Sequence, residues 1–388
     1  MKKYKIEHGL VFTDKYCFEP KTLYVAGEKL VTEEAYSVLE GPEELVDASG
    51  RYVVPGLTDV HFHGCMGYDC CDGTVEAFRN IAAYEGRQGV TTITPATMTM
   101  PEEVLMKVAH AAAAYSAEYE GEGRQPQGAV LAGLYMEGPF ICHAKKGAQN
   151  GAYIQKASKA LVERLQEASG NKFKTVVVAP ETEGTLDFIR EMAGQINISL
   201  GHTTTDYDTA VKAMEAGACE LTHLYNAMPP YNHRNPGPIA AAADFPHCRV
   251  ELICDGVHIH PAVVRTTFKI FGDDRILMIS DSMEAAGLED GSYELGGQKV
   301  IVKGNRAVLE SGTLAGSVTN LMGCVRTAVQ QMGIPLSSAI KCAAVNPAKA
   351  VGIYDRYGSL TPGKYANVVL LNQDIQAEMV FVHGAKLS

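Results

Sequence analysis

Short apolar runs alternate with longer amphipathic stretches through the middle of this sequence, and this alternation constrains the fold more than any other feature. The runs are rich in Val, Ile and Leu and are bounded by turn residues, as is typical of buried parallel strands. There are eight of them, at residues 52–62, 90–96, 129–136, 175–179, 196–200, 219–224, 250–254 and 276–280. Eight strands alternating with helices over roughly 300 residues predict an α/β fold, namely a (β/α)₈ TIM-like barrel.

The stretches between the apolar runs carry helix signals. Residues 74–86 have apolar side chains at helical spacing, and Asp206 is a candidate N-cap for a helix over 207–216 that Gly217 would end. The alternative fold is an open doubly wound sheet, which is expected to carry a glycine-rich phosphate-binding motif after an early strand. Neither G-x-G-x-x-G nor a Walker A sequence is present, so the barrel is favoured.

The two ends of the chain differ from the middle. Residues 1–54 and 355–388 contain short apolar segments separated by turns, and neither end alone would readily form a stable sheet. We therefore expect one small β-sandwich domain built from both termini, which brings the chain ends close together. The predicted barrel domain spans residues 55–354.

Charge and cysteine content exclude several classes of protein. The net charge of −11 argues against nucleic-acid and anionic membrane partners, because both need a basic surface. The longest apolar runs fall far short of the roughly 20 residues that a membrane span needs. Lys5, Glu7 and His8 interrupt any apolar stretch of the signal-peptide kind, so we expect a cytoplasmic protein. The ten cysteines include no C-x-x-C pair and are expected to be reduced thiols.

Side chains that bind metals follow the predicted strands at their carboxyl ends, where barrel enzymes place their active sites. His61 and His63 end the first strand and share one face of it, so both imidazoles can point into the barrel mouth. The other residues at strand ends are Glu137, His202, His223 and Asp281. This donor set suits Zn²⁺, with Fe²⁺ as the alternative, and is large enough for one or two ions.

Several segments resemble one superfamily. Residues 55–64 (PGLTDVHFHG) and 358–367 (GSLTPGKYAN) are similar to signature segments of the amidohydrolase superfamily of metal-dependent hydrolases, although Asp commonly stands where this chain has Asn367. The segments MEGPF, GHT, THLYNAM, DGVH, SDS and TLAGS, which follow one another in that order, are similar to the N-acetylglucosamine-6-phosphate deacetylase family within it. Many amidohydrolases bridge two metals with a lysine after strand four. Here Pro180 and Glu181 stand there instead, and the resemblance points to Glu137 as the bridging carboxylate.

This resemblance implies a reaction and roles for the metal-binding residues. The reaction is hydrolysis of the acetamide of an amino-sugar phosphate, which releases acetate. Glu137, His202 and His223 would hold the main ion, and His61 and His63 a second one. Asp281 would act as general base toward the attacking water and then deliver the proton to the leaving amine.

The resemblance also implies substrate contacts and an oligomeric state. Arg234 and His258 would bind the phosphate, and Arg234 lies in a loop that reaches the neighbouring subunit in family members, so a homodimer is expected. From the residues alone, Arg234 is equally consistent with a solvated loop position. Gln149 stands where the family often has a histidine that polarises the acetyl carbonyl, and its amide can donate but carries no charge. The other expected contacts are Ala148, Asn226, Ala227, Leu314, Ala315 and Gly316.

Three alternatives stay open at this point. One is a deacetylase for N-acetylgalactosamine 6-phosphate, which differs only at an epimeric hydroxyl that few contacts would read. Another is an amidohydrolase that acts on a cyclic amide, although such enzymes usually carry the strand-four lysine. The third is a catalytically inactive barrel, which would be expected to have lost ligands or Asp281; all are present.

Overall fold

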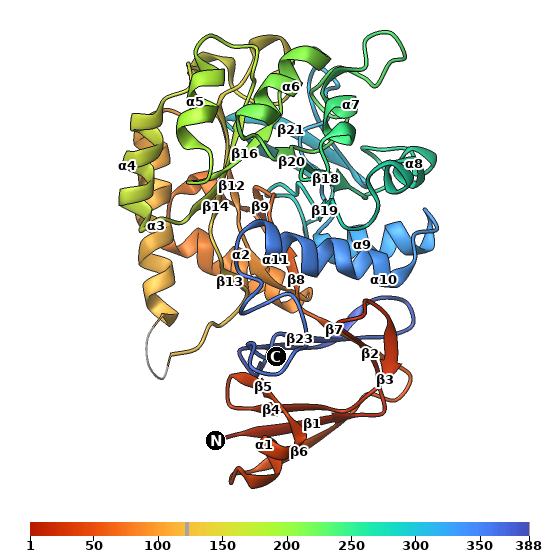
Figure 1. Cartoon of the computed structure of the whole chain (residues 1–388). Helices are drawn as coiled ribbons and strands as arrows, with labels where there is room; N and C mark the ends of the chain where they lie inside the picture. Colours follow the sequence, from red (N-terminus) through yellow and green to blue (C-terminus); the bar gives the residue numbers. More distant parts are fainter. Residues whose placement is uncertain (121–123, 388) are drawn as a thin grey trace.

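The larger part of the molecule is built on parallel strands, as the computed structural model shows (Figure 1). The model describes residues 1–120 and 124–387. The parallel strands are β8 (Leu57–Asp59), β11 (Val90–Ile93), β12 (Ala96–Thr97), β13 (Val130–Leu131), β14 (Leu134–Phe140), β15 (Phe173–Val178), β16 (Asn197–Leu200), β17 (Glu220–Leu221), β18 (Arg249–Ile253) and β19 (Ile276–Ile279). They pair in the orders β13-β11-β8 and β12-β14-β15-β16-β17-β18-β19. The predicted α/β fold with parallel strands is confirmed.

Backbone hydrogen bonds bring the segment after the first parallel strand against the segment after the last. The amide of Asp281 donates to the carbonyl of His61 over 3.0 Å, and the amide of His63 donates to Ser282 over 2.7 Å. The sheet therefore curls until the carboxyl ends of β8 and β19 are neighbours, which places two candidate site segments side by side.

Helices cover the outer face of these strands (Figure 1). Asp206 caps the predicted helix through a bond from the Thr209 amide, and Gly217 ends it, so the local signals fix both of its bounds. The helices of this part are α2 (Val75–Arg87), α3 (Glu102–Tyr119), α4 (Lys159–Ser169), α5 (Thr185–Met192), α6 (Tyr207–Ala216), α7 (Gly237–Asp244), α8 (Pro261–Phe271), α9 (Leu321–Gln330), α10 (Leu336–Ile340) and α11 (Asn346–Ala350). A π-helical turn (Lys341–Val345) joins the last two, and 3₁₀ turns lie at Cys70–Asp72, His143–Lys145 and Gly151–Tyr153.

The smaller part joins both ends of the chain, and both termini lie in the lower lobe of Figure 1. One sheet has the order β5-β4-β1-β6 and another the order β25-β24-β23-β7-β2-β3, so strands from either end pair directly. Their bounds are β1 (Lys3–Glu7), β2 (Leu10–Phe12), β3 (Phe18–Pro20), β4 (Leu23–Ala26), β5 (Lys29–Val31), β6 (Glu43–Asp47), β7 (Tyr52–Pro55), β23 (Val368–Leu371), β24 (Ala377–Val382) and β25 (Ala385–Lys386), with helix α1 (Glu33–Val38) between β5 and β6. The two sheets share an apolar core that includes Tyr4, Val25, Val53 and Phe381.

An antiparallel sheet that the sequence analysis does not predict follows the last parallel strand. It consists of β20 (Gly291–Leu295), β21 (Gln298–Lys303) and β22 (Arg306–Leu309). Along β21 the buried Val300 and Val302 alternate with exposed side chains, as in a sheet with one solvated face. A small hairpin, β9 (Gly64–Cys65) with β10 (Tyr68–Asp69), lies after β8.

Several predicted strands are shorter or divided. The run at 52–62 is two strands, β7 and β8, which belong to different sheets. They are separated at Gly56, where Thr91 lies too close for a side chain. The runs at 90–96 and 129–136 are each interrupted as well. Only Glu220–Leu221 of the run at 219–224 is a strand, since the backbone turns into the left-handed region at His223 (φ 27°).

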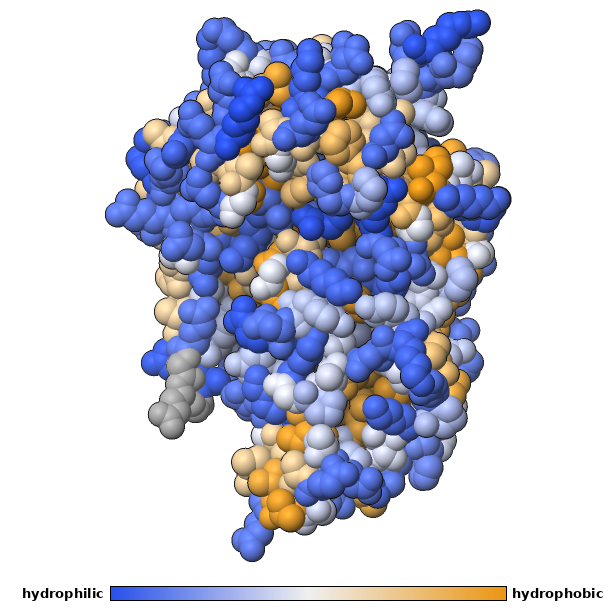
Figure 2. Space-filling model, viewed as in Figure 1, coloured by the Kyte–Doolittle hydropathy of each residue, from blue (hydrophilic) through white to orange (hydrophobic). Residues whose placement is uncertain are grey.

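The surface, the helices and the cysteines bear on the classes of protein considered above. Hydrophilic residues cover most of the face shown in Figure 2. Within the described residues, none of the helices has the length and apolar character needed to cross a membrane. All ten cysteines are free, and each is buried or half-buried.

Candidate active site

The six predicted metal-binding residues meet at the carboxyl ends of the parallel strands. Five of them line a cavity of about 380 Å³, and His61 is fully buried behind them. His202, His223 and Asp281 have positive φ values of 48°, 27° and 49°. Such backbone costs free energy for residues other than glycine and is common at active sites. Here it follows directly after strands β16, β17 and β19 and orients the three side chains toward the cavity.

Glu137, His202 and His223 form a compact group. The Oε1 atom of Glu137 lies 3.0 Å from the Nε2 atoms of both histidines, which are themselves 3.0 Å apart. Ligands at about 2.0–2.1 Å from a tetrahedral Zn²⁺ ion would be separated by roughly 3.3 Å. The three atoms thus converge at the spacing of metal ligands with little rearrangement.

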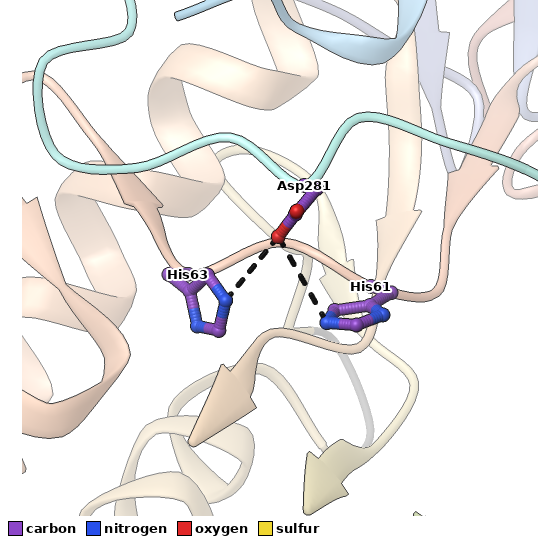
Figure 3. Close-up of side chains that lie close together, drawn as sticks. All are labelled: His61, His63 and Asp281. Atoms are coloured by element: carbon purple, nitrogen blue, oxygen red, sulfur yellow. Dashed lines mark ion pairs between the residues drawn. The ribbon is translucent and has the colours of Figure 1, made fainter. Parts of the chain in front are cut away.

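His61, His63 and Asp281 form a second, more open group (Figure 3). The Oδ1 atom of Asp281 lies 3.3 Å from Nε2 of His63 and 4.0 Å from Nε2 of His61. Glu137 connects the groups, because its Oε1 is 3.5 Å from Nε2 of His61 and its Oε2 is 3.3 Å from Nε2 of His63. One carboxylate therefore faces both sets of donors.

Acceptors behind the histidines orient the rings. Nδ1 of His61 lies 2.8 Å from the buried carboxylate of Glu251, Nδ1 of His63 lies 3.3 Å from the Ala96 carbonyl, and Nδ1 of His202 lies 2.9 Å from the Lys145 carbonyl. A proton held at Nδ1 leaves Nε2 free to ligate a metal. Glu251 lies inside the run at 250–254 and is not among the predicted site residues. A charged side chain within a buried strand was the available signal.

The residues fit a divalent cation. Nε2 of His61 is buried without a hydrogen-bond partner, although it points toward the other donors. Burial alone would raise the pKa of Glu137, but His61, His202 and His223 outweigh it and hold that pKa well below its ordinary value. Burial also opposes protonation of His63, yet Asp281 and Glu137 raise its pKa to about 10. The site thus stabilises positive charge, which is what a metal ion would supply.

A further histidine stands in the same cavity. Nδ1 of His258 lies 2.7 Å from Oδ2 of Asp255, and this carboxylate also accepts from the His258 amide. Burial opposes protonation, but the bond and the charge of Asp255 outweigh it and raise the pKa of His258. A cationic imidazole in this position favours an anionic group on a ligand.

Comparison with known proteins now identifies the family. The family model described as the amidohydrolase family matches residues 52–386. This chain belongs to the amidohydrolase family. Its candidate site lies at the carboxyl ends of the parallel strands, where barrel enzymes carry their active sites.

Curated relatives of this amidohydrolase cover most of its length. It is 34% identical over 343 residues to N-acetylglucosamine-6-phosphate deacetylase of Bacillus subtilis, with 88% of this chain and 86% of the relative covered. It is 36% identical over 333 residues to the protein of that name in Vibrio furnissii, with 86% and 82% covered. It is also 33% identical to N-acetylgalactosamine-6-phosphate deacetylase of Escherichia coli O157:H7, with 88% and 89% covered.

Solved structures show the same fold. N-acetylglucosamine-6-phosphate deacetylase of Pasteurella multocida superposes with a TM-score of 0.89 at 27% identity, and 99% of each chain is covered. A mutant of the Mycobacterium smegmatis enzyme in complex with N-acetyl-D-glucosamine-6-phosphate superposes with a TM-score of 0.88 at 28% identity, covering 100% of this chain and 99% of that one.

Most residues predicted to contact substrate line the cavity of this amidohydrolase, and two do not. Ala315 is buried and does not line it, and Arg234 is exposed and lines a separate surface pocket. Within one chain, the structure therefore does not bring Arg234 to His258. The predicted residues that do line the cavity, besides the metal-binding ones, are Ala148, Gln149, Asn226, Ala227, His258, Leu314 and Gly316.

Gln149 is engaged with a metal-binding residue. Its Nε2 donates to Oε2 of Glu137 over 2.5 Å and contacts the sulfur of Met98 at 3.4 Å. Its Oε1 accepts from the Thr99 amide over 2.6 Å. In this amidohydrolase the Gln149 side chain thus holds the carboxylate of Glu137. Its N–H could reach a substrate carbonyl only by giving up one of these contacts.

Proposed function

We propose that this chain hydrolyses the acetamide of N-acetylglucosamine 6-phosphate to glucosamine 6-phosphate and acetate. One observation carries the proposal: Glu137 joins two groups of donor side chains, and five of these six residues line one cavity together with His258. Relatives at 34% and 36% identity over most of the chain, which bear the name of this deacetylase, support the substrate.

Glu137, His202 and His223 would hold the main ion, and His61 and His63 would hold a second one beside Asp281. Zn²⁺ is the proposed metal, with Fe²⁺ as the alternative, because imidazole and carboxylate donors suit both. A bound divalent ion supplies Lewis acidity, which polarises the amide carbonyl and makes water more acidic. The spacing of the three donors in the compact group supports its assignment as the tighter site.

Asp281 is the proposed general base. Burial alone would raise its pKa, but the bond to His63 and the charges of His61 and His63 lower it, so the carboxylate is ionised and can accept a proton. It would take a proton from the attacking water and deliver it to the amine as the C–N bond breaks. Its position in the cavity, beside His63 and His61, supports this role (Figure 3).

The phosphate is proposed to bind at His258, and the sugar against Ala148, Asn226, Ala227 and Leu314 to Gly316. Arg234 is exposed and outside the cavity of its own chain, so we propose that it serves the site of a second copy in a homodimer. Arginine suits this task because its planar fork of donors matches phosphate oxygens.

The second candidate substrate is N-acetylgalactosamine 6-phosphate. The relative named for that activity in E. coli O157:H7 is 33% identical over 344 residues, almost the same similarity as that of the glucosamine relatives. The reaction and the residues that carry it would be the same, and only the contact to one hydroxyl would differ.

The finer architecture is also a proposal. We propose that the parallel strands of residues 55–354 form a closed (β/α)₈ barrel and that residues 1–54 and 355–388 form one β-sandwich domain. The bonds between the ends of β8 and β19 support closure, and the shared core of the two terminal sheets supports the sandwich. A cytoplasmic location is consistent with the free cysteines.

A substrate panel tests the proposed function. Acetate release would be measured with the Zn²⁺-loaded protein on N-acetylglucosamine 6-phosphate, on its unphosphorylated form and on the galacto epimer. We expect the first to have the highest kcat/KM and the unphosphorylated sugar to lose affinity. No acetate from any of the three, with metal bound, would contradict the proposal, and a preference for the epimer would favour the second candidate.

A further inference from the structure

A second cavity, of about 360 Å³, lies at the amino-terminal ends of the parallel strands. Its lining includes the start of β13, the start of β15 and the loop before β15, and it continues onto Tyr357, Tyr365 and His383 from the last part of the chain. None of its lining residues lines the catalytic cavity, which lies at the opposite ends of the strands. The two cavities are therefore separate, and the terminal part of the chain forms one wall of the second.

Cations outnumber carboxylates in the lining of this second cavity. Lys172 pairs with Glu120 over 3.1 Å, whereas Lys174 has no ion pair with any carboxylate in residues 1–120 and 124–387. The nearest acid to Arg356 is Asp355, at 3.6 Å, and both side chains of that pair are more than half exposed to water. The charged lining residues are Lys172, Lys174, Arg124 and Arg356 against Glu28 and Glu120. This concentration of positive charge is unusual in a chain whose net charge is −11.

The positively charged side chains around this cavity repel one another and lower the pKa of their neighbours. Burial and the charges of Lys172 and Arg356 lower the pKa of Lys174, and both of these charges are positive. Burial and the charges of Lys29 and Arg356 lower the pKa of His383 to about 4. Like charges held together in a partly buried site destabilise the charged forms. An anion bound between them would relieve this repulsion.

Aromatic rings fix the wall of the cavity. The His383 ring stacks on Tyr365 with centroids 3.9 Å apart, and its Nε2 lies 2.9 Å from the Tyr357 hydroxyl. The amino group of Lys29 lies 3.2 Å from the centroid of the Tyr365 ring. The wall is thus ordered before any ligand arrives, which lowers the entropic cost of binding.

We propose that this cavity, which we call the basic cavity and define by Lys172, Lys174 and Arg356, binds a small phosphate-bearing anion. Lysine contributes a compact charge and arginine a planar fork that matches phosphate oxygens. The volume lies near the lower end of the range for small-molecule sites and suits free phosphate or a small phosphate monoester. The ligand would contact both β15 and the C-terminal segment, and would hold the two parts of the molecule together. This inference does not depend on the reaction in the other cavity.

Calorimetric titration with inorganic phosphate at constant ionic strength tests the proposal. The parent for the titrations carries His258→Gln, which weakens phosphate binding in the catalytic cavity. We expect one binding event per chain, and we expect Lys174→Gln and Arg356→Gln each to lower its association constant by about tenfold or more. Lys156→Gln is the matched control, because Lys156 is an exposed lysine paired with Glu183 and lies outside both cavities. A parallel titration with glycerol 3-phosphate shows which source of phosphate binds more tightly.

Thermal melting gives a second readout. Without phosphate, Lys174→Gln should melt at or above the temperature of the parent, since the substitution removes a repelled charge. With phosphate, the parent and Lys156→Gln should gain melting temperature, and Lys174→Gln and Arg356→Gln should gain much less. Arg356 is mostly exposed, so loss of binding in Arg356→Gln supports the proposal even if Lys174→Gln folds poorly. Equal phosphate affinity in the parent and in both variants, or no binding at millimolar phosphate, would overturn it.

Discussion

The two donor groups of the candidate metal centre share Glu137 and differ in how tightly they are arranged. In the compact group the donor atoms lie 3.0 Å apart, whereas in the open group the oxygen of Asp281 is 3.3 Å and 4.0 Å from the two imidazoles. All three residues of the compact group would be needed as ligands to hold an ion. The open group includes a carboxylate that is less tightly held and can move a proton. This geometry supports the proposal that the compact group binds an ion and that Asp281 of the open group transfers a proton.

Glu137→Ala should have the largest effect, because it removes the carboxylate that both groups share. We expect loss of bound metal from both groups and a fall in kcat/KM of about 10⁴-fold or more, since the Lewis-acid contribution is worth several kcal/mol. Metal content by elemental analysis and acetate release measure the two effects. Glu183→Ala, at an exposed ion pair with Lys156, is the control. If the alanine variant kept two ions per chain, the bridging role would be wrong.

Asp281→Asn should separate binding from chemistry within the open group. The compact group is intact in this variant, so at least one ion should remain, while kcat should fall by about 10²- to 10⁴-fold because the base is lost. The measurement is kcat and KM alongside metal content. A variant with kcat near that of the unmodified chain would show that proton transfer is carried by another residue.

Substitution of Glu251 should show whether the open group needs the hydrogen bond that orients the His61 ring. Its carboxylate holds Nδ1 of His61 and also accepts from the His223 amide over 2.9 Å. Glu251→Ala should weaken the second ion by about 10- to 100-fold, and Glu251→Gln, which keeps an acceptor oxygen, should weaken it less. Metal titration gives both affinities. Equal weakening in the two variants would indicate a structural defect rather than loss of ring positioning.

His258→Gln should have the smallest effect and should leave both donor groups unchanged. We expect KM for the phosphorylated substrate to rise by about tenfold, with KM for the unphosphorylated sugar unaltered, because one charge-assisted hydrogen bond is lost. Although burial lowers the pKa of His258, Asp255 raises it above its ordinary value, so the positive charge is lost only as pH rises through that raised value. KM should therefore increase toward alkaline pH in the unmodified chain and less so in the variant. His247→Gln, at an exposed histidine, serves as control.

Local signals predicted the elements that local forces determine. Helix α6 agrees with its prediction at both bounds, since the Asp206 cap and Gly217 act within one turn of it. The strand runs were located correctly and bounded poorly, because strand ends depend on neighbours that periodicity does not show. Gly56 divides a single apolar run between two sheets. The β20–β22 sheet was missed, because it interrupts the regular alternation of strand and helix.

The candidate site likewise contains residues that the sequence could predict and residues whose positions depend on the rest of the fold. The six predicted metal-binding residues could be expected to lie together because the fold brings strand ends together, and this required only the order of the strands. Glu251 could not be found in that way, since it lies within β18 rather than at its end. The position of Arg234 outside the cavity depends on the path of a loop that no periodic pattern describes. Whether it reaches a second copy is a question of assembly, which one sequence does not encode locally.

The β20–β22 sheet has a consequence for how substrate preference can change. Leu295, Thr313 and Leu314 line the cavity from this sheet and the turn after it, whereas the six predicted metal-binding residues lie in or directly after the parallel strands. The sheet also has its own apolar core, which includes Met283, Val300 and Ala307. The predicted metal ligands and this part of the cavity wall are thus carried on separable pieces of chain. Insertions or exchanges in this hairpin segment offer a route to new acyl or sugar specificities that leaves the hydrolytic machinery intact.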